Sequence, residues 1–208
     1  MGTKSWWSRA DSRLLEAALG LAAALVGVFG MLIPALGVAG LVDPVDTRKV
    51  EVETGTATWT PGAVTDAAAE HGMTLTGTHQ AELVLADPDL SERLSLAVPE
   101  LTGSLFLLLI LVLLLQMART LRDGDVFVPE NARRLSVMGL TVLLQAVVSP
   151  VLTAVTTQAL VGGTPLADHI PFSATFSGAY VLLAFLVLAL GEVFRRGTKL
   201  RADTEGLV

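Results

Sequence analysis

The sequence contains no cysteine and only three histidines. Without cysteine the chain has no disulfide, no thiolate metal ligand and no cysteine nucleophile. A metal site needs three or four convergent ligands, whereas His71 and His79 match no known ligand spacing. The sequence also lacks a phosphate-binding loop and a serine nucleophile motif. We therefore expect a protein that is not an enzyme and that has no metal and no cofactor.

Charge is absent from most of four long apolar stretches, in a chain that is 52% hydrophobic. Each stretch has a core of roughly 18 or more mainly apolar residues, enough for a helix to cross a hydrocarbon layer about 30 Å thick. We expect an α-helical integral membrane protein in the lipid bilayer. Its four-helix transmembrane bundle is predicted to consist of residues 14–42, 101–118, 136–160 and 175–194.

The longest segment between these stretches, residues 43–100, is predicted to be a small extracytoplasmic α+β unit. Alternating apolar and polar residues predict about four short strands, at 50–53, 56–59, 80–85 and 94–98. The first two strands are expected to form a hairpin, and a short helix is expected over 60–72. The remaining segments are predicted to be an N-terminal tail (1–13), a cytoplasmic loop (119–135), an outer loop (161–174) and a C-terminal tail (195–208).

Basic residues are concentrated on one side of the predicted membrane protein. Eleven of the 14 lysines and arginines lie in the two tails and in the loop 119–135, whereas the other side has 12 of the 20 acidic residues. Basic residues near the ends of spans are retained in the cytoplasm. The sequence therefore predicts a multi-pass protein of the plasma membrane with both termini cytoplasmic. A cleaved signal peptide is disfavoured, because the first apolar stretch exceeds the roughly 7–15 residues of a signal's apolar region.

Polar residues on the third predicted helix indicate a candidate intramembrane cavity. Gln145, Ser149, Thr153 and Thr156 recur at three- or four-residue spacing, close to Pro150. Polar side chains in lipid are costly, and they are often functional. Hydrogen bonding between helices explains them more simply, and a small ligand-binding cavity is the alternative.

Small residues line one face of the first predicted helix. Gly20, Ala23 and Gly27 follow one another at three- and four-residue spacing. Small faces let helices approach closely in lipid. We expect this face to pack within the bundle, and a seam between the copies of a homo-oligomer is the alternative.

The loop 119–135 is the most distinctive polar segment of the chain. A turn is predicted at Asp123-Gly124, and Pro129 is expected to begin a helix. The loop is interpreted either as a tight charged turn between helices or as a docking surface for a cytoplasmic partner. The candidate docking residues are Arg122, Asp125, Phe127, Glu130, Asn131, Arg133 and Arg134.

A short pattern runs through this loop. It consists of Gly124, Phe127, Glu130, Asn131, Arg134 and Leu135. The pattern, together with Gly197 and the pair Leu200-Arg201, resembles a bacterial membrane protein family catalogued as domain of unknown function 2975. The resemblance is expected to cover the whole four-span layout. It implies no enzyme activity, and because family members are often encoded beside a helix-turn-helix regulator, it implies a transcription regulator as partner.

These observations favour a non-enzymatic sensory or regulatory membrane protein. The outer unit or the bundle would sense an envelope signal or ligand, and the inner surface would tether or restrain the cytoplasmic partner. Direct binding to nucleic acid is not expected. A transporter or channel component is an alternative supported by the polar third helix with its proline. A structural subunit of a membrane complex is the other alternative.

Overall fold

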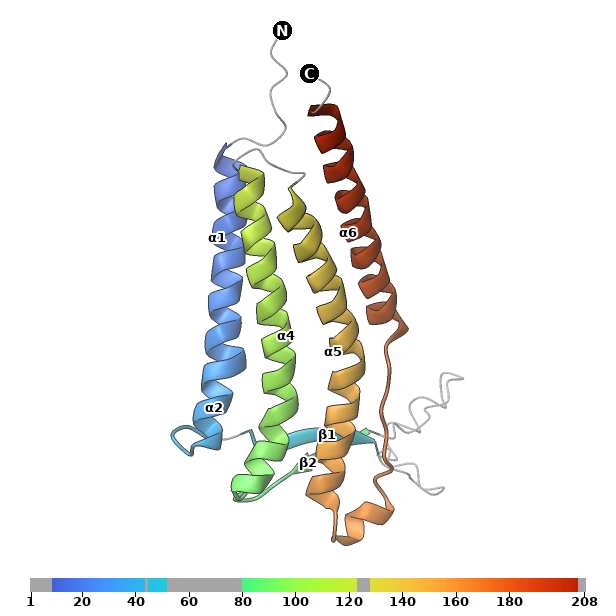
Figure 1. Ribbon diagram of the computed structural model, residues 1–208. Coiled ribbons are helices and arrows are strands. Elements are labelled where there is room, and N and C mark those ends of the chain that lie inside the picture. The colour runs from blue at the N-terminus through green and yellow to red at the C-terminus, as the bar shows by residue number, and fades with distance from the viewer. Residues whose placement is uncertain (1–8, 44, 52–79, 123–127, 206–208) are drawn as a thin grey trace, which may run out of the picture.

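The computed structural model describes residues 9–43, 45–51, 80–122 and 128–205. Long helices dominate this part of the chain, and a two-stranded sheet accompanies them (Figure 1). In chain order the elements are α1 (Arg9–Leu25), η1 (Val26–Leu32), α2 (Ile33–Val38), β1 (Thr47–Glu51), β2 (Gln80–Val84), α4 (Leu90–Arg122), α5 (Pro129–Val161), η2 (Pro165–Asp168) and α6 (Gly178–Glu205).

Within the described residues, four helical stretches are long and apolar enough to cross a membrane. They are Arg13–Val38, Leu90–Arg122, Pro129–Val161 and Gly178–Leu200. The prediction of a mostly helical chain with four such helices is therefore confirmed. At about 1.5 Å per residue, the 33 residues of α4 and of α5 each extend about 50 Å, more than a hydrocarbon layer requires.

The four helices stand in a row, in the order α1, α4, α5 and α6 (Figure 1). α1 packs on α4, α4 on α5, and α5 on α6. The start of α1 and the end of α6 lie at one end of the molecule, which we call the basic end; the sheet lies at the other, the sheet end. The expected bundle is thus an open row, in which the two outermost helices leave broad apolar faces uncovered. On α6 these faces include Leu182, Phe185, Leu186 and Val193.

The sheet joins two segments that are distant in the sequence. β1 and β2 are antiparallel, with Thr47 opposite Val84 and Glu51 opposite Gln80. The strand predicted at residues 80–85 is confirmed by β2. The strand predicted at 50–53 overlaps β1 at residues 50 and 51, while residues 52 and 53 lie outside the described part of the chain, and β1 pairs with β2. The predicted hairpin partner, residues 56–59, and the predicted helix at 60–72 lie outside the described residues.

The strand predicted at residues 94–98 was wrong, because these residues belong to α4. The helix begins after a reciprocal cap. The Glu92 backbone N–H donates to Asp89 Oδ1 at 2.8 Å, and the Asp89 N–H donates to Glu92 Oε2 at 2.8 Å. Such a capping box satisfies backbone donors that a first helical turn leaves unpaired. It starts the helix before the alternating residues are reached, so their pattern does not decide the local structure.

Two glycines bring α5 and α6 close together. A Cβ added at Gly139 would lie 2.6 Å from Leu188 Cγ, and one added at Gly191 would lie 3.0 Å from Ser136 Oγ. By contrast, a Cβ added at Gly20 on α1 or at Gly27 on η1 would meet no atom within 4 Å. Both glycines are partly covered, but neither lies at a close helix contact of the kind seen at Gly139, and the packing of this face within the bundle stays a prediction.

Candidate functional site

One arginine of the sheet holds β1 onto the ends of two helices. Arg48 donates from Nη1 to Thr156 Oγ1 at 2.6 Å and to Thr157 Oγ1 at 3.4 Å, both on α5. From Nη2 it donates to the carbonyl oxygens of Ser95 and Leu96 on α4, at 2.8 and 2.9 Å. We call these five residues the Arg48 cluster. A single side chain thereby connects the sheet to both central helices of the row.

The contact between Arg48 and α4 has a local cause in Pro99. This proline lies inside α4 and has no backbone N–H, so it cannot donate to the carbonyl of Ser95, four residues earlier. The Arg48 guanidinium supplies a donor to that carbonyl. A backbone acceptor that the helix leaves unpaired is thus satisfied from the sheet.

The Arg48 side chain is partly buried between the strand and the helices. Burial lowers the pKa of its guanidinium below the ordinary value, while the nearby Glu100 carboxylate opposes this effect. An arginine stays charged under such conditions, because its ordinary pKa is far above neutral. The guanidinium therefore acts as a permanent cationic donor at this junction.

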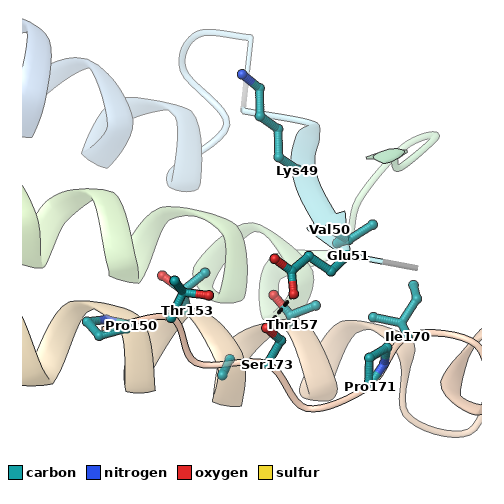
Figure 2. Close-up of a pocket in the computed structure, with 11 residues that line it drawn as sticks. Lys49, Val50, Glu51, Pro150, Thr153, Thr157, Ile170, Pro171 and Ser173 are labelled. Carbon is teal, nitrogen blue, oxygen red and sulfur yellow. Dashed lines mark hydrogen bonds between the residues drawn. The ribbon is translucent and has the colours of Figure 1, made fainter. Parts of the chain in front are cut away.

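Beside the Arg48 cluster lies a cavity of about 240 Å³, which we call the sheet-end cavity (Figure 2). It is enclosed by β1, by α5 and by the stretch that follows η2. Its lining residues are Lys49, Val50, Glu51, Pro150, Thr153, Ala154, Thr157, Ile170, Pro171, Ser173 and Thr175. Ser173 donates to Glu51 Oε2 at 2.6 Å across one edge of the cavity.

An apolar cluster supports this cavity. Val50 packs with Val161 and Ile170, all three of which are buried, and Leu83 and Ala167 pack against them. Because Val50 follows two residues after Arg48, both side chains of β1 point toward the helices. The sheet is therefore attached by an apolar contact as well as by the Arg48 cluster.

The polar residues predicted to form one intramembrane cavity are divided between different places. Thr153 lines the sheet-end cavity, and Thr156 is buried in the Arg48 cluster, where it also donates to the Leu152 carbonyl at 2.8 Å. Gln145 lines a separate, mainly apolar groove between the helices. Ser149 is partly exposed. The spacing correctly placed these residues on one helix. They do not share one cavity, because α5 packs against different elements at different points along its length.

A second polar cluster lies at the basic end. Asn131 is fully buried at the start of α5. Its Oδ1 accepts from Thr120 Oγ1 at 3.0 Å and from Arg134 Nη1 at 2.8 Å. Arg134 Nη1 also donates to the Gln116 carbonyl at 3.4 Å. This Asn131 cluster fastens the end of α4 to the start of α5.

Ion pairs add α1 to the same end. Glu16 accepts from Arg119 Nε at 3.0 Å and from Arg122 Nη1 at 2.7 Å. The glutamate is mostly covered, whereas both arginines are substantially exposed. Exposed pairs contribute little to stability, so their main effect is to align α1 with α4.

The predicted docking residues of the loop 119–135 therefore have different surroundings. Asn131 is in the interior, so direct contact with a partner through this side chain is contradicted by its burial. Arg134 is partly covered and bonded to Asn131, and Arg122 pairs with Glu16. Glu130 and Arg133 are exposed. Asp125 and Phe127 lie outside the described residues.

No group of three or more His, Asp or Glu side chains is placed to hold a metal ion within the described ranges. His169 is exposed in this part of the chain. His71 and His79, which the sequence singled out, lie outside it. The chemistry of the described site is thus hydrogen bonding between an arginine, hydroxyls and backbone carbonyls.

The Arg48 cluster was missed by sequence reasoning, which counted Arg48 only as a charge on the outer side. A usable signal was present, because the acidic segment has very few basic residues and Pro99 stands next to an apolar run. The prediction of a strand at residues 94–98 concealed that signal. Only a proline inside a helix leaves a carbonyl four residues earlier without its backbone donor, and Pro99 was expected to follow a strand.

Four long apolar helices with a small sheet at one end define a multi-pass helical protein suited to a membrane. A family model described as protein of unknown function (DUF2975) matches residues 76–208, more than half of the chain, and the chain belongs to this family. The matched region starts after the first of the four spans, Arg13–Val38, so it covers only the other three. The expectation that the resemblance covers all four spans was therefore too broad. Arg48 and α1 precede the matched region. No curated protein and no solved structure matches the chain.

Proposed function

We propose that this protein is a non-enzymatic membrane sensor whose sheet end detects an envelope signal and whose basic end restrains a cytoplasmic partner. The observation that carries the proposal is the Arg48 cluster. It attaches the sheet to α4 and α5, and the same two helices are fastened to each other at the basic end by the Asn131 cluster. A displacement of β1 would therefore change the relation between the two helices that flank the basic-end turn.

The orientation required by this proposal follows the distribution of charge. The basic end has Arg13, Arg119, Arg133 and Arg195, together with further arginines and Lys199, whereas the sheet end is acidic. Basic residues favour the cytoplasmic side. We therefore propose that both termini are cytoplasmic, in the plasma membrane, and that the sheet end faces the envelope.

The partner surface is proposed to be the exposed part of the basic-end turn. Glu130 and Arg133 are accessible there, on the same helical turn as the buried Asn131. A small helix-turn-helix regulator is the partner that the family resemblance implies. The alternative of a transporter is less well supported, because the described polar residues of α5 are divided between an apolar groove and the sheet end.

A photo-crosslinking amino acid at position 133 tests the proposed partner, with the same amino acid at Ser173 as the matched control at the sheet end. In native membranes, we expect position 133 to capture one abundant cytoplasmic protein with a helix-turn-helix sequence, and Ser173 to capture none. Capture of no cytoplasmic protein at position 133, or the same proteins at both positions, would contradict the proposal.

A further inference from the structure

An apolar groove runs along the row of helices. Its volume is about 830 Å³, and η1, α2, α4, α5 and α6 all contribute to its lining. Most of the lining side chains are apolar, including Leu107, Ile110 and Val187. Along α4 the groove extends from Glu100 to Leu114, about 21 Å at the rise of an α-helix. This length exceeds half of a hydrocarbon layer about 30 Å thick, so it suits the acyl chain of a lipid from one leaflet.

A polar cavity at the sheet end shares one lining residue with the groove. This second cavity, which we call the mouth, has a volume of about 380 Å³, and Glu100 lines it as well as the groove. Arg48, Lys49 and Glu82 also line the mouth. Lys49 is opposite Glu82 in the sheet register, and Figure 2 shows its side chain directed away from Glu51 and Ser173. A long apolar groove thus ends at charges of both signs.

We propose that the groove and the mouth together bind one phospholipid with an ethanolamine head group. The acyl chain occupies the groove, where it covers aliphatic side chains. The head group lies in the mouth, where its ammonium meets the carboxylates of Glu100 and Glu82 and its phosphate meets the ammonium of Lys49. This site is independent of the proposed cytoplasmic partner.

The charges of the mouth distinguish this occupant from an anionic lipid. Phosphatidylglycerol with the same acyl chains has a phosphate but no cation. In the mouth its phosphate would still meet Lys49, but Glu100 and Glu82 would have no ammonium group to pair with, so this lipid would form fewer ion pairs there. The groove alone binds both lipids equally, so the selectivity comes from the head group.

Two substitutions separate the two parts of the site. Glu100→Gln removes the carboxylate shared by the groove and the mouth. Gly103→Leu fills the groove, because Gly103 lines it and a Cβ added there would meet no atom within 4 Å. Gly20→Leu is the matched control, since Gly20 has the same open surroundings but does not line the groove.

The purified full-length protein is equilibrated with an equimolar mixture of phosphatidylethanolamine and phosphatidylglycerol that have identical chains. Native mass spectrometry then counts the lipids that each variant retains. We expect the wild type and Gly20→Leu to retain phosphatidylethanolamine about fivefold over phosphatidylglycerol, equivalent to about 1 kcal/mol. Glu100→Gln should lose most of this selectivity, because only Glu82 then remains to meet the ammonium. Gly103→Leu should retain neither lipid above the non-specific background.

Equal retention of both lipids by the wild type would overturn the proposal, as would wild-type selectivity in Glu100→Gln. Retention by Gly103→Leu at the wild-type level would overturn the assignment of the groove. Size-exclusion chromatography shows which variants are folded. If Gly103→Leu does not fold, Leu107→Phe fills the same groove at a position that is already apolar.

Discussion

At the scale of single residues, Arg48 is the side chain on which the attachment of the sheet depends. A guanidinium presents several donors in a fixed plane, and here two of its nitrogens reach α5 hydroxyls and α4 carbonyls at the same time. A lysine at this position would supply one flexible ammonium. Hydrogen bonds from a charged donor contribute about 1.5–3 kcal/mol each when they are shielded from water.

Arg48→Met should therefore lower the free energy of unfolding by about 2 kcal/mol. The loss should shrink by about 1 kcal/mol in a Pro99→Ala background, because alanine restores the backbone donor for the Ser95 carbonyl. Unfolding of the four proteins in mixed detergent micelles measures this cycle. Lys49→Met, at the exposed neighbouring position, is the control and should be nearly neutral. Strict additivity of Arg48→Met and Pro99→Ala would contradict the role given to the proline.

The Arg48 cluster could not be predicted from the sequence alone. Its members come from β1, α4 and α5, and their convergence depends on how these elements pack. The pattern at the basic end was easier to detect, since Glu130, Asn131 and Arg134 lie close together in the sequence. Asn131 was nonetheless predicted to be a docking residue, whereas its side chain is buried. The polarity of a residue alone does not reveal that its side chain is buried.

At the scale of elements, hydropathy was sufficient to predict four long helices, because lipid requires each span to satisfy its own backbone hydrogen bonds. Short alternating runs were less informative. Residues 94–98 alternate as a strand does, yet the capping box at Asp89 and Glu92 starts a helix ahead of them. Helix ends are thus determined here by side chains that hydropathy does not register.

The cap of α4 should make the stability of this helix sensitive to acid. The backbone N–H of Glu92 and then the Ser91 hydroxyl hold the pKa of Asp89 below its ordinary value. A carboxyl whose pKa is lowered by folding stabilises the fold at neutral pH, and this contribution is lost as the pH falls below about 4. Asp89→Asn keeps a capping side chain without the titration.

Thermal unfolding of wild type and Asp89→Asn between pH 7 and pH 3 measures this contribution. We expect the wild type to be the more stable protein at pH 7 and the difference between the two melting temperatures to become smaller as the pH falls from about 4 to 3. A difference that stays constant across this range would show that ionisation of Asp89 has no part in the cap.

The contact between α5 and α6 should tolerate no side chain at Gly139. Gly139→Ala places a Cβ against Leu188, at an overpacking cost of about 2 kcal/mol that exceeds the gain in helix propensity of about 1 kcal/mol. A net destabilisation of about 1 kcal/mol is expected in detergent unfolding. Gly20→Ala, with open surroundings, should instead be neutral or stabilising. The same sign for both variants would contradict the proposed close approach.

At the scale of the whole molecule, the row of helices connects two polar clusters at opposite ends. α4 and α5 take part in both, while α1 and α6 flank them. Hydropathy did not distinguish this open row from a closed bundle, since both expose apolar faces to lipid. Charge distribution did indicate which ends of the helices lie together, because the basic residues gather at the end opposite the sheet.

The central claim is that the sheet end is coupled to the basic-end turn through α4 and α5. The absence of cysteine allows spin labels to be placed at Leu121→Cys on α4 and Arg133→Cys on α5 without other changes. Both positions are exposed beside the turn. Pulsed electron resonance in lipid nanodiscs then measures the distance between the labels.

The doubly labelled protein with Arg48 intact is the reference. Arg48→Met in this protein should shift the distance between the two labels by several ångströms or broaden its distribution, because the sheet no longer holds α4 and α5 together at the sheet end. Lys49→Met should leave the distribution unchanged. An unchanged distribution in Arg48→Met protein that retains its helical circular dichroism would contradict the coupling.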